Sequence, residues 1–459
     1  MSILPIDSCR YGSEEMKEIF KEDMKLQYQL NFEAEVAITQ AELNIIPPAA
    51  AKEISVLARS KMITSKRVKQ LERISEHDTA AVVEAISERC SSVTKPWVHF
   101  GLTSNDVIDS CTSMQIRDAF AILEPKLSKL SLALLYKAKE FRRVPAVGRT
   151  HGQHASIISF GLKFAVWASE LAQHLDRIEE GKKRFLMCKT LGVVGTGSLM
   201  GTKAIEVQEK VAERLGLNPI EAATQVIPRE RFAESQFVVS LIGCTLDKIA
   251  VEIRNLQRTE IGEVEEPFRK GQMGSSAVPV KRNPIKSERV SSLARILRSL
   301  LAVAMENIPL WHERDLTNSA NERFTFPMSF ILVDEMLNAM LRIFEGLKVN
   351  PQRIKDNINK TKGQIYSEFL LEALVKKEIP RFSAYRDIQR IAFDALENGE
   401  DFQDIVMKDP SIMKNLTIAE LKKIFNPSNH LSASEKIITN VSNGVKKTIS
   451  KLGSGSKIK

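Results

Sequence analysis

The sequence predicts an all-α protein built around a central bundle of long helices, and three observations indicate this fold class. Apolar residues recur at three- and four-residue intervals over long segments, with Glu, Lys and Arg between them. Runs in which apolar and polar residues alternate, as in half-exposed strands, are almost absent. The 459 residues include only 21 glycines and 17 prolines, and 43% of them are apolar, which excludes a disordered or collagen-like chain.

The helical pattern is clearest in six segments. The first covers 14–46 and is stopped by Pro47-Pro48, because proline cannot continue a helix. The others are predicted at 113–143, 155–186, 229–265, 286–307 and 327–348. Most of these helices are long for a globular protein, which implies that they pack side by side in a bundle. The segment 230–260 is apolar on more than one face and is therefore expected inside the bundle.

We expect three domains followed by a tail. The predicted limits are an N-terminal helical domain at 1–105, the bundle at 106–349, a C-terminal helical domain at 350–432 and a flexible basic tail at 433–459. Six lysines after Glu435 account for +6 of the net charge of +9, so the body of the chain is nearly neutral. A nucleic-acid partner is not expected, because such binding would depend on this tail alone.

The cysteines and the N-terminal residues indicate the cellular compartment in which the protein is expected. The cysteines form no CxxC pair and are odd in number, so neither a disulfide framework nor a zinc knuckle is indicated; they are Cys9, Cys90, Cys111, Cys188 and Cys244. The first ten residues lack a basic start followed by an apolar run, and no stretch approaches the roughly 18 apolar residues of a membrane span. We therefore expect a cytoplasmic protein without a membrane partner.

Neither a metal nor an organic cofactor is expected. His151 and His154 lie three residues apart, but no third ligand has a suitable spacing and no HExxH motif is present. The glycine-rich segment 191–201 has the spacing GxGxxxG and no surrounding βαβ pattern, so it does not indicate a dinucleotide site. We interpret it as a loop on the substrate side of a site. Three other histidines are expected to be structural: His99, His174 and His430.

The segment 271–288 carries the densest set of reactive side chains. Its glycines let the backbone approach a ligand closely, and Ser275 and Ser276 offer hydroxyls. Lys281 and Asn283 can hold a carboxylate or lower the pKa of a neighbouring hydroxyl. By composition alone, the segment is equally compatible with a solvated loop between helices.

This segment, G-S-S-A-V-P-V-K-R-N-P, resembles the signature loop G-S-S-x-M-P-x-K-x-N-P of the fumarase/aspartase superfamily of lyases, and within it most resembles the adenylosuccinate lyases. Val278 stands where the signature usually has Met. Seven further motifs extend the resemblance in order from about residue 10 to about 430: Arg10-Tyr11, Glu76-His77-Asp78, Thr103-Ser104-Asn105-Asp106, Gly148-Arg149-Thr150-His151-Gly152-Gln153, Thr224-Gln225 with Pro228-Arg229, Arg258-Thr259-Glu260 with Glu263-Val264-Glu265-Glu266, and Trp311-His312-Glu313-Arg314-Asp315-Leu316. The resemblance implies a three-domain fumarase/aspartase-like fold and a homotetramer with active sites shared between chains.

The chemistry that this resemblance implies is a β-elimination. Fumarate leaves adenylosuccinate to give AMP, or leaves the succinylated aminoimidazole carboxamide ribotide of purine nucleotide biosynthesis. By resemblance the base is Ser275, or its neighbour Ser276, and the acid is His151. His77 would support the acid from a neighbouring chain, and Lys281 would assist the serine. A serine hydroxyl is a weak acid, so the base needs a nearby cation or amide donors.

The substrate contacts that the resemblance implies are mostly cationic or hydroxyl side chains, as a substrate with two carboxylates and a phosphate requires. The phosphate and its neighbours would be held by Arg10, Tyr11, Arg314, Ser319 and Arg323, and the succinyl carboxylates by Thr103, Ser104, Gln225, Lys281 and Asn283. Glu76 and Asp78 beside His77 are further candidate contacts, although relatives often have Arg at the position of Glu76. The alternatives are another fumarate-releasing lyase, such as argininosuccinate lyase, and a catalytically silent structural homologue.

Overall fold

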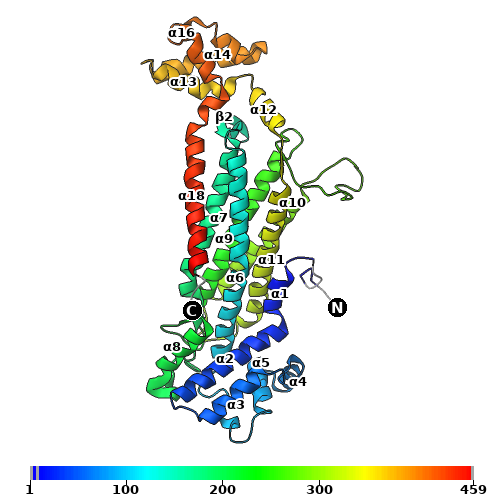
Figure 1. The fold of residues 1–459 in the computed structure, drawn as a ribbon, viewed down its shortest axis with the longest axis vertical. Helices are drawn as coiled ribbons and strands as arrows, with labels where there is room; N and C mark the ends of the chain where they lie inside the picture. The colour runs from blue at the N-terminus through cyan, green and yellow to red at the C-terminus, as the bar shows by residue number, and fades with distance from the viewer. Residues whose placement is uncertain (1–3, 7–9, 456–459) are drawn as a thin grey trace. The chain divides into compact units, whose positions relative to one another are not determined.

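The computed structural model describes residues 4–6 and 10–455, and its secondary structure is dominated by α-helices (Figure 1). The predicted all-α class is confirmed. The chain divides into two compact units, each assembled from three segments. Unit 1 comprises Met1–Leu127, His174–Leu246 and Val290–Asn338, and unit 2 comprises Ser128–Gln173, Asp247–Arg289 and Ala339–Lys459. The limits of the three expected domains stay a prediction. Cys9 and the last four residues lie outside the described part of the chain.

The N-terminal part of unit 1 contains five short or medium helices, of which the last four share a core. They are α1 (Glu14–Phe20), α2 (Glu22–Glu42), α3 (Pro48–Arg59), α4 (Ser65–Ser75) and α5 (Asp78–Ser87). The single helix expected over 14–46 is divided, because Lys21 adopts an extended conformation between α1 and α2. Pro48 begins α3, where a proline costs no hydrogen bond. Leu30, Ile54 and Ile86 from three of these helices are almost fully buried in one cluster.

Five long helices form the predicted bundle, and each contributes residues to both units. They are α6 (Ser104–Glu140), α7 (Phe160–Phe185), α9 (Arg229–Leu256), α10 (Ile285–Glu306) and α11 (Ser319–Gly346). In unit 1, Phe120 of α6 packs against Phe185 of α7 and Phe330 of α11, with ring centroids 5.3 and 5.2 Å away. In unit 2, Phe164 of α7 packs against Phe344 of α11 at 6.2 Å. Within each unit, aromatic side chains therefore join the helices.

Some of the expected helix limits were wrong. Residues 153–159 form strand β2, so α7 begins at Phe160 and not at 155. The helix expected over 229–265 ends at Leu256, and Gly262 then adopts a positive φ of 63° that a helix does not allow. The helix expected at 113 begins at Ser104. Each error lies at a helix end, where local hydrogen bonds rather than apolar spacing decide the limit.

The only sheets among the described residues are three two-stranded ones. β1 (Pro145–Thr150) and β2 (Gln153–Ser159) form an antiparallel hairpin in unit 2. Its two-residue turn, His151-Gly152, has φ values of 53° and 74°, which is the geometry of a type I′ turn. The other pairs are very short: β3 (Met187–Cys188) with β4 (Asn218–Pro219), and β5 (Val264–Glu265) with β6 (Lys348–Val349). Unit 1 also contains η1 (Lys95–Trp97), η2 (Ser198–Lys203) and α8 (Ala204–Leu215).

The C-terminal part of unit 2 consists of short helices packed on the hairpin. They are α12 (Pro351–Asn359), η3 (Gln364–Tyr366), α13 (Ser367–Val375), α14 (Arg381–Asn398), α15 (Phe402–Val406), α16 (Pro410–Met413), α17 (Ile418–Ile424) and η4 (Pro427–His430). Their buried residues form one cluster that includes Val147 of β1 and Ile157 of β2. This core fixes the base of the hairpin.

The expected flexible tail is corrected by the structure, because residues 432–455 form the 24-residue helix α18 (Ser432–Gly455). Ile438 and Val445 lie seven residues apart on one face of α18 and are only 4% and 3% exposed. Glu435 accepts a hydrogen bond from Arg143 at 3.2 Å. The prediction of a flexible tail rested on the lysines of this segment and overlooked the spacing of its apolar residues.

One helix in the described part of the chain, α11, has the length and hydropathy of a membrane span. However, 78% of its most apolar window is buried inside the protein, as is typical of a core helix.

Candidate active site

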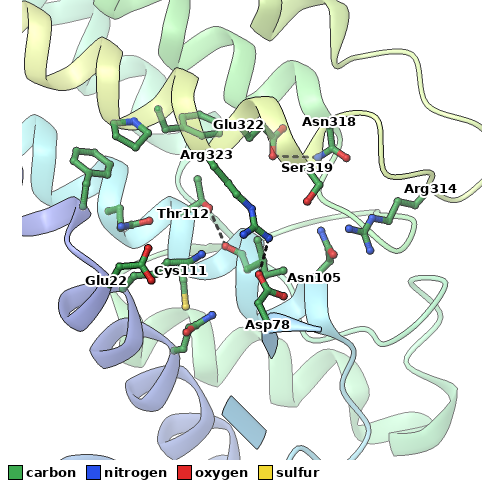
Figure 2. Close-up of a pocket in the computed structure, with 17 residues that line it drawn as sticks. Glu22, Asp78, Asn105, Cys111, Thr112, Arg314, Asn318, Ser319, Glu322 and Arg323 are labelled. Atoms are coloured by element: carbon green, nitrogen blue, oxygen red, sulfur yellow. Dashed lines mark hydrogen bonds and ion pairs between the residues drawn. The ribbon is translucent and has the colours of Figure 1, made fainter. Parts of the chain in front are cut away.

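A cavity of about 150 Å³ lies in unit 1, lined by residues of α2, α5, α6 and the start of α11 (Figure 2). Arg314, Ser319 and Arg323, three of the five residues expected around the phosphate, line it together with Asp78. Arg10 and Tyr11 do not line this cavity; the Arg10 guanidinium lies 5.9 Å from the centroid of the Tyr11 ring. The structure thus brings together Arg314 and Arg323, two of the three arginines expected around the phosphate.

Arg323 is held by a carboxylate inside this cavity. Figure 2 shows its side chain extending from α11 toward Asp78, and Nη2 lies 2.8 Å from Asp78 Oδ2. Burial opposes ionisation of Asp78, but the charges of Lys25 and Arg323 and a hydrogen bond from the Thr79 N–H outweigh it and lower the pKa of Asp78. Asp78 is therefore a carboxylate that neutralises Arg323 before any substrate binds.

Arg314 enters the same cavity from the loop that precedes α11. Its Nη1 donates to Gln225 Oε1 at 3.0 Å, and the Gln225 N–H donates to the Glu313 carbonyl at 3.3 Å. Its Nε is buried and has no hydrogen-bond partner among the described residues. Burial lowers the pKa of Arg314 from its usual value. The motifs around Gln225 and Arg314, far apart in sequence, therefore meet, and Arg314 keeps an unused buried donor.

A buried charge network supports this wall of the cavity. Arg229 of α9 lies 2.7 Å from Asp109 Oδ1 of α6 and 3.4 Å from Glu322 Oε1 of α11, and its side chain is 1% exposed. Asp109 also accepts the Ile227 N–H at 2.8 Å. Burial raises the pKa of Glu322 despite the nearby Arg229. Arg229, part of the Pro-Arg motif, thus joins three helices and does not line the cavity.

A second, shallower cavity of about 520 Å³ in unit 1 gathers His77, Thr103 and Ser104. The Nδ1 atom of His77 accepts a hydrogen bond from the Ala80 N–H at 3.2 Å and caps α5. In the neutral ring the proton therefore sits on Nε2, where it can be donated to another group. Glu76 lines neither cavity; it follows the last residue of α4 in a left-handed conformation with φ 52°.

Thr103 and Ser104 are positioned by a buried ion pair. Lys189 Nζ lies 2.5 Å from Asp106 Oδ1, and both side chains are 0% exposed. Asp106 Oδ2 accepts the Thr103 N–H at 2.8 Å and the Gly192 N–H at 3.1 Å. Asp106 therefore ties the start of α6 to the glycine-rich loop at 191–201. His99, expected to be structural, pairs with Glu33 at 2.6 Å.

The candidate acid, His151, lies in unit 2 at the turn of the β1–β2 hairpin, and its side chain is exposed. Arg149 anchors this hairpin, because Nη2 and Nη1 lie 2.6 and 3.3 Å from the two carboxylate oxygens of Glu263. Glu263 also accepts a hydrogen bond from Asn357 Nδ2 at 2.8 Å. Burial and the charge of Arg149 lower the pKa of His154. The hairpin tip is thus open while its base is fixed.

The signature loop, also in unit 2, places amide donors on the candidate base. Ser275 Oγ accepts hydrogen bonds from the N–H groups of Ala277 at 3.3 Å and Val278 at 3.1 Å. Asn283 Nδ2 donates to the Gly274 carbonyl at 2.8 Å and closes the loop. A Cβ atom on Gly274 would lie 1.9 Å from the Lys281 carbonyl, so only glycine fits there.

Ser276 and Lys281 are both exposed, and no hydrogen bond joins either of them to Ser275 Oγ in the described part of the loop. The amide donors expected around the base are therefore present for Ser275, whereas Lys281 would need to move to reach it. Within the described residues, no group of three His, Cys, Asp or Glu side chains is arranged to hold a metal ion.

The C-terminal end of the loop is held by glutamates of the Glu-Val-Glu-Glu motif, which precedes the loop. Glu266 Oε1 accepts hydrogen bonds from the N–H and Oγ of Ser287 at 2.8 and 2.5 Å. Its Oε2 accepts the Lys286 N–H at 3.2 Å, so Glu266 caps α10. Glu265 pairs with Arg282 at 2.6 Å. This motif therefore positions the loop.

Sequence reasoning missed several residues that line the first cavity. Glu22, Lys25 and Gln29 come from α2, and Thr112 and Gln115 come from α6. They lie in regular amphipathic helices, and no motif distinguishes them from solvent-facing residues. Asn105 also lines the cavity and could have been found, because it lies inside the Thr103-Ser104-Asn105-Asp106 motif.

Comparisons with known proteins agree with this geometry. Residues 10–297 match the family model described as lyase, and residues 363–441 match that of the adenylosuccinate lyase C-terminus. The chain is 42% identical to the adenylosuccinate lyase of Methanocaldococcus jannaschii over 96% of both proteins. It is 44% identical to that of Pyrococcus abyssi, over 97% of this chain and 98% of the relative.

Solved structures share the fold over nearly the whole chain. The 3-carboxy-cis,cis-muconate lactonizing enzyme from Pseudomonas putida has a TM-score of 0.87 at 26% identity, and covers 97% of this chain and 100% of its own. The fumarate lyase from Mesorhizobium sp. BNC1 has a TM-score of 0.86 at 28% identity, and covers 94% of this chain and 98% of its own. From the near full-length identity to curated relatives and the matching C-terminal model, the chain belongs to the adenylosuccinate lyase family of lyases.

Proposed function

We propose that the protein eliminates fumarate from adenylosuccinate to give AMP, and cleaves the succinylated aminoimidazole carboxamide ribotide of purine nucleotide biosynthesis in the same way. The observation that carries this proposal is the cavity that gathers Arg314, Ser319 and Arg323 at the start of α11. Two guanidinium groups and a hydroxyl suit a nucleotide phosphate. The identity of 42–44% to adenylosuccinate lyases over nearly the whole chain supports the same substrate.

The phosphate would bind at the N-terminus of α11. The N-terminus of a helix carries positive potential, and Ser319 is the first residue of this helix. Its N–H donates to the Leu316 carbonyl at 3.1 Å, so its hydroxyl is the group that it offers to the cavity. Arg323 lies one turn further along, and Arg314 precedes the helix with a free buried Nε. A dianionic phosphate attracts Arg323 more strongly than Asp78 does, so we infer that binding exchanges one ion pair for another.

The base would be Ser275 in its alkoxide form. Two backbone N–H groups point at its Oγ, and such donors stabilise an oxygen that carries negative charge. The alkoxide takes a proton from the succinyl carbon beside a carboxylate and becomes a hydroxyl. The electron pair left on carbon then forms the double bond of fumarate, while the C–N bond to the purine amino group breaks.

The acid would be His151, which gives its proton to the departing nitrogen. His77 would assist it, because the proton on its Nε2 can be shared with a neighbouring side chain. An exposed hairpin tip is a poor place for acid catalysis unless another surface covers it. We therefore propose a homotetramer in which several chains complete each active site.

The remaining assignments belong to the same proposal. Thr103, Ser104, Gln225, Lys281 and Asn283 would hold the succinyl carboxylates. The protein would act in the cytoplasm, with a small anionic nucleotide as its substrate and no cofactor.

The proposal is tested by fumarate release from adenylosuccinate, with argininosuccinate assayed in parallel. We expect release from adenylosuccinate alone, and none from the Ser275→Ala variant at the same concentration. Release from argininosuccinate alone would reassign the substrate. Release from neither, by a folded oligomer, would favour the silent homologue.

A further inference from the structure

We propose that a cavity of about 510 Å³ at the base of the hairpin in unit 2 is a binding site for a small anion that carries a flat ring, as a nucleoside monophosphate does. This inference goes beyond the proposed function, which does not use the cavity. The volume lies within the roughly 300–1,000 Å³ of small-molecule sites.

The cavity is built by several elements of unit 2. α12 supplies Lys355 and Asn359, η3 supplies Tyr366, and Val144 and Pro145 line it at the start of β1. α12 packs against β1, and Figure 1 shows it near the end of the hairpin. A ligand here would touch the strand that leads to His151.

A hydroxyl without a hydrogen-bond partner lies at the wall of this cavity. Tyr366 is 6% exposed and lines the cavity, and its hydroxyl has no hydrogen-bond partner among the described residues. Burial raises the pKa of Tyr366, so the hydroxyl stays protonated and able to donate. A bound acceptor would gain a hydrogen bond from this hydroxyl.

The charges favour an anion. Arg143, Lys355 and Lys362 line the cavity against one carboxylate, Asp401. Asp401 is already engaged by the Gln403 N–H at 2.9 Å. Outside the lining, Glu435 Oε2 lies 3.2 Å from Arg143 Nε, so that cation is partly neutralised.

Lys362 donates to the Gly399 carbonyl at 2.5 Å, which is a neutral acceptor. Lys355 has no ion pair or hydrogen bond within the described part of unit 2, so its ammonium is available to a ligand. The excess of one or two positive charges suits a single phosphate or carboxylate group.

The apolar part of the lining favours a ring. The Tyr366 and Phe425 rings pack edge to face, with centroids 5.5 Å apart and planes at 72°. Ile358 and Pro427 complete this side of the cavity. A free phosphate would leave these surfaces uncovered, whereas a planar base can pack on them. The site should therefore prefer AMP to either inorganic phosphate or adenosine.

The test is hydrogen exchange measured by mass spectrometry on the full chain, titrated separately with AMP, inorganic phosphate and adenosine. We expect AMP to protect segment 351–366 saturably, and the two fragments of the ligand to do so at least about tenfold more weakly, since each loses one set of contacts. Segment 314–323 reports on the proposed phosphate site in the same experiment.

Three variants complete the test. Lys355→Glu and Tyr366→Phe should weaken the protection of 351–366 by AMP and leave that of 314–323 unchanged. Lys376→Glu alters an exposed lysine that does not line the cavity and should behave as the wild type. Absence of AMP protection at 351–366 in the wild type overturns the inference, even when 314–323 is protected. Equal protection in Lys355→Glu and wild type also overturns it.

Discussion

Glu263 binds Arg149 through both of its carboxylate oxygens, at 2.6 and 3.3 Å, and its side chain is completely buried. The arginine lies two residues before His151 in the hairpin. Glu263 thus controls the strand that presents the candidate acid, although it lies in a motif that could have been assigned to substrate binding.

Replacing this glutamate should destabilise the protein and reduce its activity. Glu263→Gln removes the charge that compensates a mostly buried arginine, so we expect a loss of about 3 kcal/mol in the free energy of unfolding. Urea unfolding followed by circular dichroism measures it. The control is Glu265→Gln, which breaks the more exposed pair with Arg282 and should cost less than about 1 kcal/mol. Equal losses in both variants would contradict the anchoring role.

The candidate base and acid should each be needed for turnover. We expect Ser275→Ala and His151→Ala to lower kcat by at least about a hundredfold, as for lost acid–base catalysis, without changing the oligomer. Steady-state assays and size-exclusion chromatography measure the two properties. Ser276→Ala is the matched control, because the two amide donors bind Ser275 Oγ and not its neighbour. A normal rate in Ser275→Ala would remove it as the base.

Shared active sites predict complementation between inactive chains. When Ser275→Ala and His151→Ala proteins are mixed and allowed to exchange subunits, some sites receive one intact residue of each kind, and activity should return. The measurement is fumarate release before and after exchange, which mass spectrometry of mixed oligomers verifies. No recovery in verified mixed oligomers would contradict sharing.

Lys25 should contribute to substrate binding. It lines the first cavity, and its charge helps to lower the pKa of Asp78. Lys25→Met should raise KM for adenylosuccinate about tenfold and leave kcat nearly unchanged, because a phosphate contact acts equally in the ground and transition states. Lys52→Met, at an exposed position outside the cavity, is the control. A fall in kcat with unchanged KM would place Lys25 in a different role.

The pair His99–Glu33 predicts a pH dependence of stability. Burial disfavours the charged ring, but Glu33 outweighs it and raises the pKa of His99 above 6.5. The stabilisation is therefore complete below about pH 6.5 and is lost as the pH rises through the folded-state pKa. His99→Gln should unfold earlier than the wild type at pH 6, with a smaller difference at pH 8, as measured by thermal melts.

His174 provides a control, because its effect on stability should change with pH in the opposite direction. Burial lowers its pKa to about 4, so its contribution to the free energy of unfolding is present above pH 6.5 and falls as the pH drops toward 4. A difference between His99→Gln and wild type that grows with pH would contradict the assignment of the His99 pair.

Much of the fold could be predicted because helices that are buried in a bundle need apolar residues at three- and four-residue intervals, and this spacing is visible in the sequence. The long helices and their order follow from it, as in α9 and α10. The hairpin could not be predicted in this way. The seven residues of β2 lead directly into α7, and their alternation of apolar and polar residues is too short to be recognised. α18 was missed because the excess of lysine over acidic residues after Glu435 and the Gly-Ser end were interpreted as a flexible tail, whereas two buried residues hold the helix in place.

The candidate site was predictable where motifs name its residues. Arg314, Ser319 and Arg323 meet as expected, because they lie within one turn-and-helix segment whose geometry is local. Lys25 and Glu22 could not be found, because a side chain that points into a cavity and one that points into water follow the same helical period. The amide donors of Ser275 belong to the backbone, which a list of side chains does not reveal.

The bonds of Glu266 bear on how the protein would respond to a protease. Its carboxylate holds the N–H groups of Lys286 and Ser287, and its own N–H donates to Gln257 Oε1 at 2.9 Å. Trypsin has exposed sites at Lys281 and Arg282, between these two anchors. A single cut there would sever the chain, but Glu266 on one fragment would still hold the N–H groups of Lys286 and Ser287 on the other. The nicked enzyme should give two fragments on a denaturing gel and still elute as one particle.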